Sequence, residues 1–327
     1  MSRKVFSNPY IAYEYAVHGL MALPAGICQS VADEQIRIKD KTYTMRLLSV
    51  GEAPKDAPTL VLIGGVHGLE SIGVDILLNY IKALIHQSAW SDTTRAMLKS
   101  VRLLALPMAN PSGIAKNSRA NGHGVDLMRN APIDAKQRAS WLVGGHRYSR
   151  LLPWYRGRLG CLEPESQVLF DWCNQLMCEG PITVIVDIHS GFGVHDQIWY
   201  PYAGQTTPFP NLPDVNALQA LFDQSYPHHH HYVFSQQSEH YITHGDLWDW
   251  IFDHRQAQDP KPFIPLTLEL GSWLWLKKNP RQLTHRNGLF HPVVAHRRSR
   301  VLRQHFVLFD FLLKACESWQ HWTSSPS

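Results

Sequence analysis

The sequence predicts an α/β fold with three layers, in which helices cover both faces of a mixed, mostly parallel central sheet. Two observations lead to this prediction. Short runs rich in Val, Ile and Leu alternate along the chain with longer segments whose apolar residues recur at helical spacing. Most of the short runs are apolar without interruption, which is typical of parallel strands buried on both faces. With 327 residues and 44% hydrophobic content, the chain can bury a sizeable core.

The candidate elements follow one another in a regular order. Residues 34–50 resemble an antiparallel hairpin around Lys41, and the first 55 residues would edge the sheet. Apolar, β-rich runs predict strands at residues 59–65, 101–109, 182–189, 197–203 and 265–270. Helical periodicity predicts helices at residues 71–87, 164–179, 215–224, 246–255 and 298–319.

Composition argues against several classes of protein. The net charge of +4 is spread along the chain, and the densest basic cluster, residues 296–300, is too short to indicate nucleic-acid binding. No window of about 20 apolar residues predicts a membrane span, and the N-terminus lacks the apolar stretch of a secretory signal. The five cysteines are an odd number without a C-x-x-C pair, so we expect reduced thiols and a cytoplasmic protein.

Four of the 19 histidines stand together at residues 228–231. This tract follows the turn signal Tyr226–Pro227 and precedes a strand candidate at residues 232–235. We expect a surface loop there, because adjacent residues on one strand point to opposite faces and do not converge on one ion. A metal site is the second interpretation of the tract.

Polar residues with metal or acid–base chemistry stand where the predicted strands end. His67 and Glu70 follow the first central strand, Asn110 follows the second, His189 ends the third and Glu269 ends the last. Because parallel sheets bind ligands in the crevice beyond the carboxyl ends of their strands, we expect these side chains to meet there. Any one of them alone would carry little weight.

His67 and Glu70 are candidate metal ligands in the stretch GGVHGLESIG, residues 64–73. Their i, i+3 spacing gives them a shared face if the turn begins a helix. They could also be a loop histidine and the first acidic residue of a helix, and the two interpretations are compatible. A catalytic zinc takes three protein ligands and leaves one position for water, and His189 is the best candidate for the third. The alternative for His189 is a strand-end histidine bonded to a carbonyl.

Three further groups suit hydrolytic chemistry. Glu269 is a candidate general base, because a carboxylate on an otherwise apolar strand is costly without a partner or a function. Arg119 and Arg129 carry guanidinium groups suited to carboxylate recognition or to oxyanion stabilisation. Asp126 lies between them and could hold a ligating histidine.

The order of these motifs resembles the zinc carboxypeptidase (M14-like metallopeptidase) family, with its succinylglutamate desuccinylase and aspartoacylase relatives. The motifs are His67-x-x-Glu70, Asn110-Pro-Ser-Gly113, Arg119 with Gly124-Val-Asp-Leu-x-Arg-Asn130, Asp187-Ile-His-Ser190, and Glu269. Tyr241, ahead of Gly245 and Asp249-Trp250, is similar to the family segment whose tyrosine closes over substrate. The resemblance implies one zinc-peptidase-like catalytic domain over residues 1–327, with an edge segment (1–55), a core that carries the motifs (56–275) and a C-terminal helical segment (276–327).

The resemblance also implies a reaction. His67, Glu70 and His189 would bind one Zn²⁺, and Glu269 would act as general base and then as acid. The implied reaction is attack of a metal-bound water on an amide carbonyl. The substrate would be a peptide or, as an alternative, an N-acyl amino acid. Neither a nucleic acid nor a membrane is expected as a partner.

Other residues would then position the substrate. Arg119 would polarise the scissile carbonyl and steady the oxyanion. Arg129 and Asn130 would bind substrate, with Arg129 holding the terminal carboxylate, and Tyr241 would cap the site. Asp126 would orient His67.

Three departures from the family pattern bear on the substrate. Met128 stands where the family has an asparagine beside the carboxylate-binding arginine, and Leu69 stands where several digestive carboxypeptidases carry an arginine. Trp248 falls where the specificity pocket is often lined, so its indole could narrow that pocket. Together they favour a zinc-dependent amide hydrolase in the broad sense over a strict carboxypeptidase. The GGVHGLE context is closer to the deacylase branch.

Two other classes of protein compete with this interpretation. A metal-free binding protein on the same fold is disfavoured because all three candidate ligands are present. A serine hydrolase would use Ser190 with His189 and Asp187, but adjacent residues of a strand do not converge as a triad. The sequence also has no G-x-S-x-G motif.

Overall fold

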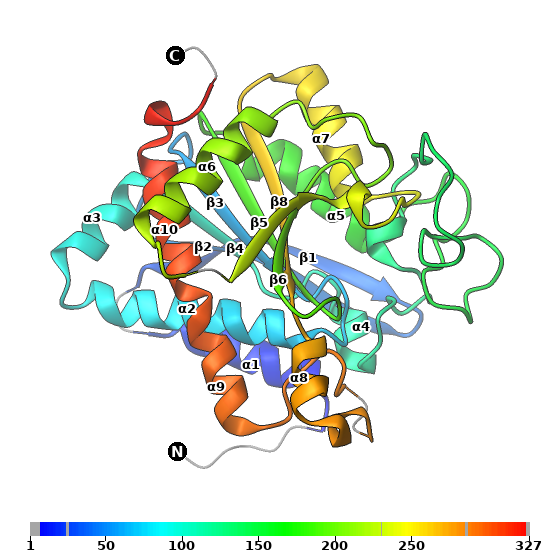
Figure 1. The fold of residues 1–327 in the computed structure, drawn as a ribbon. Coiled ribbons are helices and arrows are strands. Elements are labelled where there is room, and N and C mark those ends of the chain that lie inside the picture. The colour runs from blue at the N-terminus through cyan, green and yellow to red at the C-terminus, as the bar shows by residue number, and fades with distance from the viewer. Residues whose placement is uncertain (1–6, 24–25, 230, 285–286, 325–327) are drawn as a thin grey trace.

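An eight-stranded mixed sheet forms the centre of the protein, and helices cover both of its faces (Figure 1). The computed structural model describes residues 7–23, 26–229, 231–284 and 287–324. The strand order is β1-β2-β4-β3-β5-β8-β6-β7. This arrangement confirms the predicted three-layer α/β fold.

Four parallel strands make up the middle of the sheet, and all of their residues are buried. They are β3 (Thr59–Gly64), β4 (Arg102–Leu106), β5 (Thr183–Ser190) and β8 (Phe263–Leu270). Burial on both faces explains why these segments are uninterrupted apolar runs in the sequence. The predicted strand at 101–109 ends three residues early, because the chain turns towards the next helix after Leu106.

The two edges of the sheet contain the antiparallel pairs. At one edge β1 (Cys28–Ile38) and β2 (Lys41–Val50) form the predicted hairpin, and β2 pairs antiparallel with β4. At the other edge β6 (Asp196–Tyr200) runs antiparallel to β8, and β7 (Tyr232–Gln236) runs parallel to β6. The histidine tract thus leads into a strand as expected, although its His230 lies outside the described residues.

Helices on one face of the sheet pack against one another and against β3 and β5. They are α2 (Ser71–Ser88), α3 (Asp92–Ser100), α9 (Ala295–Gln304) and α10 (Phe306–Glu317), and α6 (Leu212–Ser225) joins them where Phe222 meets Phe311 edge to face. On the other face α5 (Pro164–Trp172) and α7 (Leu247–Gln258) pack together through stacked Phe170 and Trp250. No helix among the described residues is long and apolar enough to cross a membrane.

Several helices differ from the prediction for local reasons. Helix α3 spans nine residues and buries only Leu98, so it has too few apolar residues to stand out in the sequence. Helix α1 (Pro9–Met21) and the short helices α4 (Pro111–Lys116) and α8 (Trp273–Lys278) were also not predicted. The single helix expected at 298–319 is two helices, α9 and α10, which meet at the buried His305.

The register of β5 against β8 decides which side chains face the same way. Asp187 pairs with Thr267, and His189 pairs with Glu269. Because side chains alternate along a strand, these four residues project from one face of the sheet near its carboxyl edge. The neighbouring residue Val186 faces the opposite layer, where it meets α6 and α10. The register thus places His189 beside Glu269.

Asn110 ties the end of β4 to the turn that follows β3. Its side chain accepts a hydrogen bond from the Gly113 amide at 2.8 Å, which caps α4, and donates one to the Val66 carbonyl at 3.0 Å. Asn110 is fully buried. Both bonds are therefore shielded from water, and their loss would leave buried polar groups unpaired.

Replacing Asn110 with alanine should lower the free energy of unfolding by about 2 kcal/mol, because a cap and a second buried hydrogen bond are lost together. The measurement is denaturant-induced unfolding. Asn8→Ala is the matched control, since Asn8 caps α1 through a single bond to the Tyr10 amide and should cost only about 1 kcal/mol. Equal losses in the two variants would contradict the linking role of Asn110.

Candidate metal centre and active site

The turn between β3 and α2 carries His67 and Glu70. A Cβ atom on Gly68 would lie 2.0 Å from the carbonyl carbon of Gly113, so glycine is required where this turn packs on the start of α4. The Glu70 amide donates to the His67 carbonyl at 2.9 Å, and Glu70 immediately precedes α2. The stretch is therefore both a helix start and a pair of candidate ligands.

His67, Glu70 and His189 form a buried cluster at the carboxyl ends of the strands. Their donor atoms lie within 4.8 Å of one another, and no other such group occurs among the described residues. His189 Nδ1 lies 3.1 Å from Glu70 Oε2, and the two imidazole rings meet edge to face with centroids 4.9 Å apart. The predicted triplet is thus brought together in space.

The donor set fits a zinc ion. Two imidazole nitrogens and one carboxylate are a common ligand set for catalytic zinc. His67 Nδ1 is buried and has no hydrogen-bond partner in the described part of the chain, so it is available as a ligand. Burial, and then the positive charge of Arg119, lower the pKa of His67 well below its usual value, which keeps the ring neutral. A neutral imidazole is the form that binds a metal.

The ring of His189 lies between the carboxylates of Glu70 and Asp187. Asp187 Oδ2 lies 2.8 Å from His189 Nε2, and it accepts a hydrogen bond of 3.0 Å from the indole of Trp248. Burial opposes protonation of His189, but Asp187 and Glu70 outweigh it and raise the pKa of His189 well above its usual value. Because Nε2 faces Asp187, Nδ1 is the nitrogen that can be offered to a metal.

Trp248 has a different role from the expected one. It is buried at 3% exposure and does not line the cavity in front of the cluster. Its indole is committed to Asp187, so it supports the ligand His189 instead of narrowing a specificity pocket. The contact between Asp187 and His189 could have been predicted from the sequence, since residues two apart on a strand share a face.

Asp126 lies beside His67 but does not hydrogen-bond to it. Its Oδ1 is 3.8 Å from His67 Nδ1 and accepts a bond from the Met128 amide, while its Oδ2 accepts a bond of 2.8 Å from Arg119 Nε. Burial alone would raise the pKa of Asp126, but Arg119 and His67 hold it well below the usual range. Its closest side-chain partner is therefore Arg119, which also reaches Glu70 Oε1 at 3.4 Å.

Glu269 stands next to the cluster as a buried carboxylate. Burial and the negative charge of Glu70 raise the pKa of Glu269 to about 8, while His189 and Arg119 act in the opposite direction. A carboxylate whose pKa lies near neutrality can both take up and release a proton. A cation among the three ligands would lower this pKa, because opposite charge favours the ionised form.

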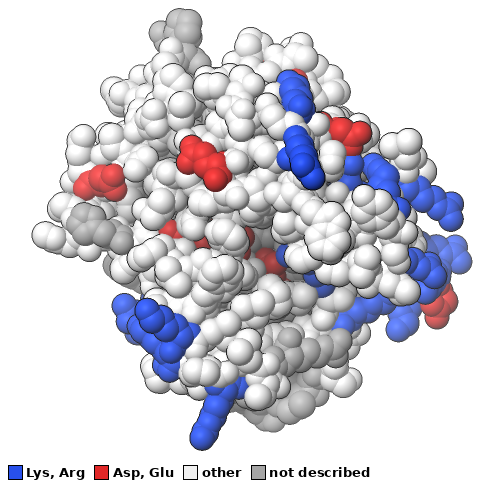
Figure 2. Space-filling view, turned by 45° about the vertical axis from the view of Figure 1, so that its right-hand side comes forward, with Lys and Arg blue, Asp and Glu red and all other residues white. Residues whose placement is uncertain are grey.

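A cavity of about 580 Å³ opens in front of the cluster. It is lined by all three candidate ligands and by four of the other predicted site residues: Arg119, Arg129, Tyr241 and Glu269. Leu69 and Met128, the two departures from the family pattern, also line it. In Figure 2 the surface is hollowed near its centre, and acidic and basic atoms show inside the hollow. The guanidinium of Arg129 lies 5.9 Å from the ring centre of Tyr241, so the two can act on one ligand.

Asn130 is the predicted substrate-binding residue that the structure places outside this cavity. Its amide nitrogen donates to the Arg156 carbonyl at 3.0 Å, and its oxygen accepts a bond of 2.7 Å from the Glu163 amide. Asn130 therefore holds the loop that follows it. Because both polar atoms of its side chain bond to the backbone of that loop, Asn130 supports the loop and does not face the cavity.

Some residues of the cavity were not singled out from the sequence. Thr267 lines the cavity because it lies two residues before Glu269 on the same strand face, and this spacing could have identified it. Phe290 lines it from the C-terminal segment, where its carbonyl accepts a bond of 2.8 Å from the Ser190 hydroxyl. Nothing local in the sequence marks Phe290, because its place depends on packing of distant segments.

The fold and the site agree with a comparison against protein families. Residues 31–278 match the model of the zinc carboxypeptidase family. Because the match covers most of the chain and includes every motif described above, the chain belongs to the zinc carboxypeptidase family, whose members are zinc metallopeptidases.

Individual relatives are more distant. The chain is 22% identical over 246 residues to carboxypeptidase SOL1 of Arabidopsis thaliana, covering 72% of this chain and 45% of the relative. It is 25% identical over 201 residues to carboxypeptidase E of Caenorhabditis elegans, covering 55% of this chain and 41% of the relative. The chain thus spans less than half the length of these curated relatives.

Solved structures share the fold. Carboxypeptidase A from Helicoverpa armigera superposes with a TM-score of 0.69 at 18% identity, covering 94% of this chain and 73% of the other. Thrombin-activatable fibrinolysis inhibitor superposes with a TM-score of 0.64 at 16% identity over the same shares of both chains. At these identities the likeness supports the architecture alone.

Trp248→Phe should weaken zinc binding about tenfold, because it leaves the carboxylate that orients His189 without its indole donor. Competition with a chromophoric chelator measures the affinity. Trp250→Phe is the matched control, since Trp250 lies on the same helix but stacks on Phe170 away from the cluster. Equal zinc affinity in both variants would show that the indole does not support His189.

Proposed function

We propose that this protein is a zinc-dependent, metallocarboxypeptidase-like peptidase that hydrolyses an amide bond. The observation that carries the proposal is the position of Glu269. It lies beside His189 in the strand register and lines the same cavity as the three candidate ligands. The family membership of the chain supports the same reaction class.

Zinc bound by His67, Glu70 and His189 would supply Lewis acidity and lower the pKa of water at the site. Glu269 would accept the proton of the attacking water and pass it to the leaving amine. Arg119, which lines the cavity next to Glu70, would stabilise the negative charge that develops on the carbonyl oxygen. Asp187 keeps His189 oriented throughout.

Arg129 is suited to hold a substrate carboxylate. It is buried at 2% exposure, its guanidinium donates to the backbone carbonyls of Val143 and Met128, and it also interacts with the Tyr241 side chain. Within the described residues it forms no ion pair, so an anionic group that enters the cavity can pair with it. Tyr241 faces the same guanidinium and would close over the bound group.

A serine hydrolase is not supported. The Ser190 hydroxyl donates to the Phe290 carbonyl, and the two nitrogens of His189 face Glu70 and Asp187. Ser190 therefore has no general base in contact with its hydroxyl.

Glu269→Gln should reduce turnover by at least a thousandfold while leaving about one zinc per chain, because the amide cannot accept the proton but keeps the shape of the site. Hydrolysis of a peptide and metal content of the same preparation are the two measurements. His189→Ala is the comparison variant and should lose zinc and activity together. Turnover that survives Glu269→Gln would show that another group is the base.

Met128→Asn should lower KM about tenfold for peptides with a free C-terminal carboxylate, because it adds a hydrogen-bond donor next to Arg129 in the cavity. C-terminally amidated peptides should show no such change, and N-acyl amino acids complete the panel. Leu69→Asn is the control that adds an amide elsewhere in the same cavity. An equal gain with amidated peptides would contradict carboxylate recognition at Arg129. Faster cleavage of N-acyl amino acids than of any peptide would favour a deacylase.

A further inference from the structure

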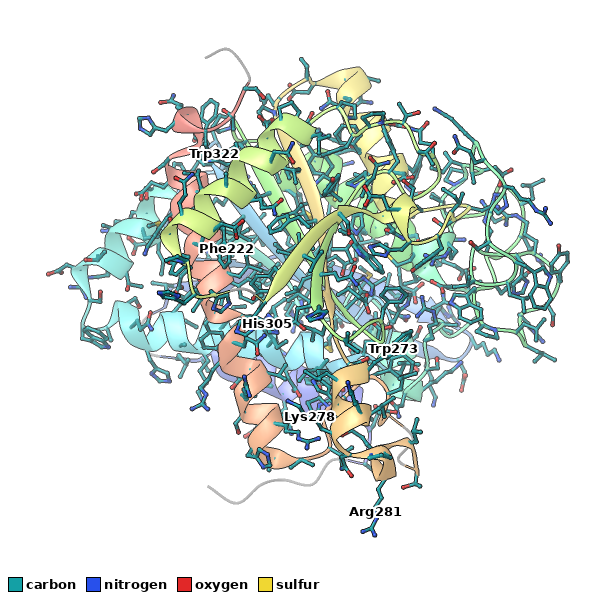
Figure 3. All side chains as sticks on the ribbon, in the orientation of Figure 1. Phe222, Trp273, Lys278, Arg281, His305 and Trp322 are labelled. Carbon is teal, nitrogen blue, oxygen red and sulfur yellow. The ribbon has the colours of Figure 1, made fainter. Side chains whose placement is uncertain are left out.

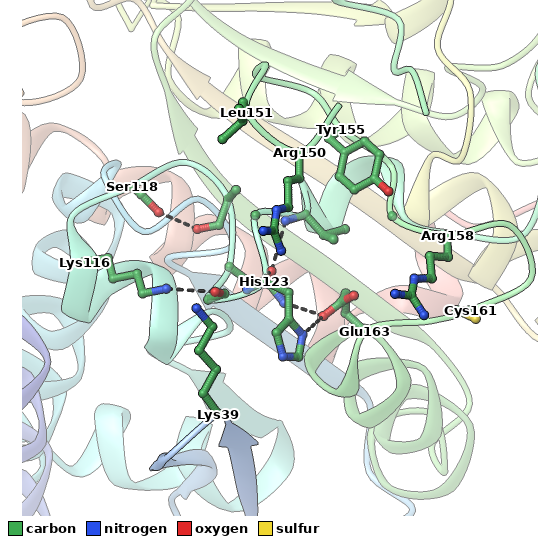
Figure 4. A pocket seen from close by; sticks show the side chains of 16 residues that line it. Lys39, Lys116, Ser118, His123, Arg150, Leu151, Tyr155, Arg158, Cys161 and Glu163 are labelled. Atoms are coloured by element: carbon green, nitrogen blue, oxygen red, sulfur yellow. Dashed lines mark hydrogen bonds and ion pairs between the residues drawn. The ribbon is translucent and has the colours of Figure 1, made fainter. Parts of the chain in front are cut away.

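A second cavity has a volume of about 850 Å³, and Figure 4 shows the side chains that line it. Three segments that are distant in the sequence line it. Lys39 comes from the β1–β2 turn, Lys116 from the end of α4, and Arg150 and Arg158 from the loop of residues 135–162. We call it the cationic cavity.

The cationic cavity has a large excess of positive charge. Glu163 is the only Asp or Glu among its described lining residues, and it is already paired with His123 Nδ1 at 2.6 Å and Asn121 Nδ2 at 2.8 Å. The side chains of Lys39, Arg150 and Arg158 form no ion pair or hydrogen bond within the described residues. Cations gathered in a concave surface focus a positive potential that attracts anions.

Repulsion among these cations is visible in one of them. Burial, and then the charges of Lys39 and Lys41, lower the pKa of Lys116. The ammonium group of Lys116 donates a hydrogen bond of 2.8 Å to the Gly122 carbonyl. An anion in the cavity would relieve this repulsion.

The loop of residues 135–162 continues the same surface. It contains six Lys or Arg residues and no Asp or Glu. Several of its apolar side chains are largely exposed, among them Leu151 at 88% and Leu159 at 78%. Lys and Arg side chains gather on the right of Figure 2, the side of the molecule on which this loop lies in Figure 1. Exposed apolar groups among cations suit a partner that is both acidic and partly apolar.

The two cavities share their walls. Ser118 and Ala120 line the cationic cavity, whereas Arg119 between them lines the active-site cavity. Leu151 and Tyr155 likewise line the cationic cavity, whereas Pro153 and Trp154 between them line the active-site cavity. Short stretches of chain therefore have residues in both cavities, so the two cavities are neighbours on the surface.

We propose that the cationic cavity binds acidic side chains of the peptide substrate, upstream of the bond that is cleaved in the active-site cavity. This proposal rests on the proposed peptidase function. It names the substrate class as peptides with a run of Asp or Glu residues before the C-terminal residue. The free cations Lys39, Arg150 and Arg158 would make the contacts, and the exposed Leu151 would border them.

Two hexapeptides with the same C-terminal leucine test the proposal, one with three Glu residues upstream and one with three Gln residues. The wild-type protein gives kcat/KM for both, and the Glu269→Gln protein loaded with zinc gives the dissociation constants by fluorescence anisotropy. We expect about a tenfold preference for the Glu peptide in both measurements at low salt, shrinking at 0.5 M salt. The triple variant K39A/R150A/R158A should reduce the preference to about twofold or less.

The matched control is K277A/K278A/R281A, which removes the same net charge from exposed residues at α8 and the following turn. Lys278 and Arg281 lie at the lower end of the molecule, away from the loop of residues 135–162 (Figure 3). The control should keep the tenfold preference. Circular dichroism and thermal unfolding of both triple variants show whether each is folded, and the single variant R158A provides a milder form of the same test.

Each outcome decides the proposal. Equal affinity for the Glu and Gln peptides, or equal loss of preference in the two triple variants, would overturn it. A hexathymidylate competitor that displaces the Glu peptide more strongly than unlabelled Glu peptide does would also overturn it, in favour of a nucleic-acid site. If wild-type protein cleaves neither peptide but the binding preference persists and depends on K39A/R150A/R158A, the acidic-peptide site stands and the peptidase function fails.

Discussion

The pairing of β5 with β8 is the constraint on which the rest of the site depends. Two parallel strands in register place His189 opposite Glu269, and alternation of side chains puts Asp187 and Thr267 on the same face. A shift of β5 by one residue would turn Asp187 and His189 into the opposite layer, where α6 and α10 pack, and would separate them from Glu269. The buried apolar residues of both strands specify that register. Packing of the core therefore fixes the positions of the side chains in the site.

Buried charge is the second organising feature. Glu70, Asp126, Asp187 and Glu269 are all less than 10% exposed at one end of the sheet. Arg119 balances two of them and Trp248 donates to a third, but burying this many carboxylates is costly without further positive charge. A divalent cation among His67, Glu70 and His189 would supply that charge, which links metal binding to the stability of the fold.

The loops around the strand ends divide the surface into two connected cavities with different chemistry. One holds the buried reacting groups, and the other is lined by cations. The same short segments separate the two, and different residues of each segment face each cavity. In many α/β proteins the catalytic residues lie at the strand ends and the adjoining loops bind the ligand.

Local patterns in the sequence were enough to predict the fold class and the candidate reacting groups. Uninterrupted apolar strands at regular spacing predicted the parallel sheet, and polar residues at their ends predicted where His67, Glu70, His189 and Glu269 meet. Local patterns suffice for this, because runs of apolar residues mark the buried strands and the residues that follow each run mark where the strand ends. The short helix α3, which buries only Leu98, was not predicted, and neither was the break between α9 and α10 at His305.

The partners of these groups became known from the three-dimensional packing of the chain. Trp248 supports His189 through Asp187, Asn130 holds a loop instead of facing the cavity, and Phe290 enters the site from the C-terminal segment. The cationic cavity likewise joins Lys39 to Arg150 and Arg158 across more than 100 residues. Contacts between distant segments depend on how layers and loops pack, and no short-range pattern in the chain encodes that packing.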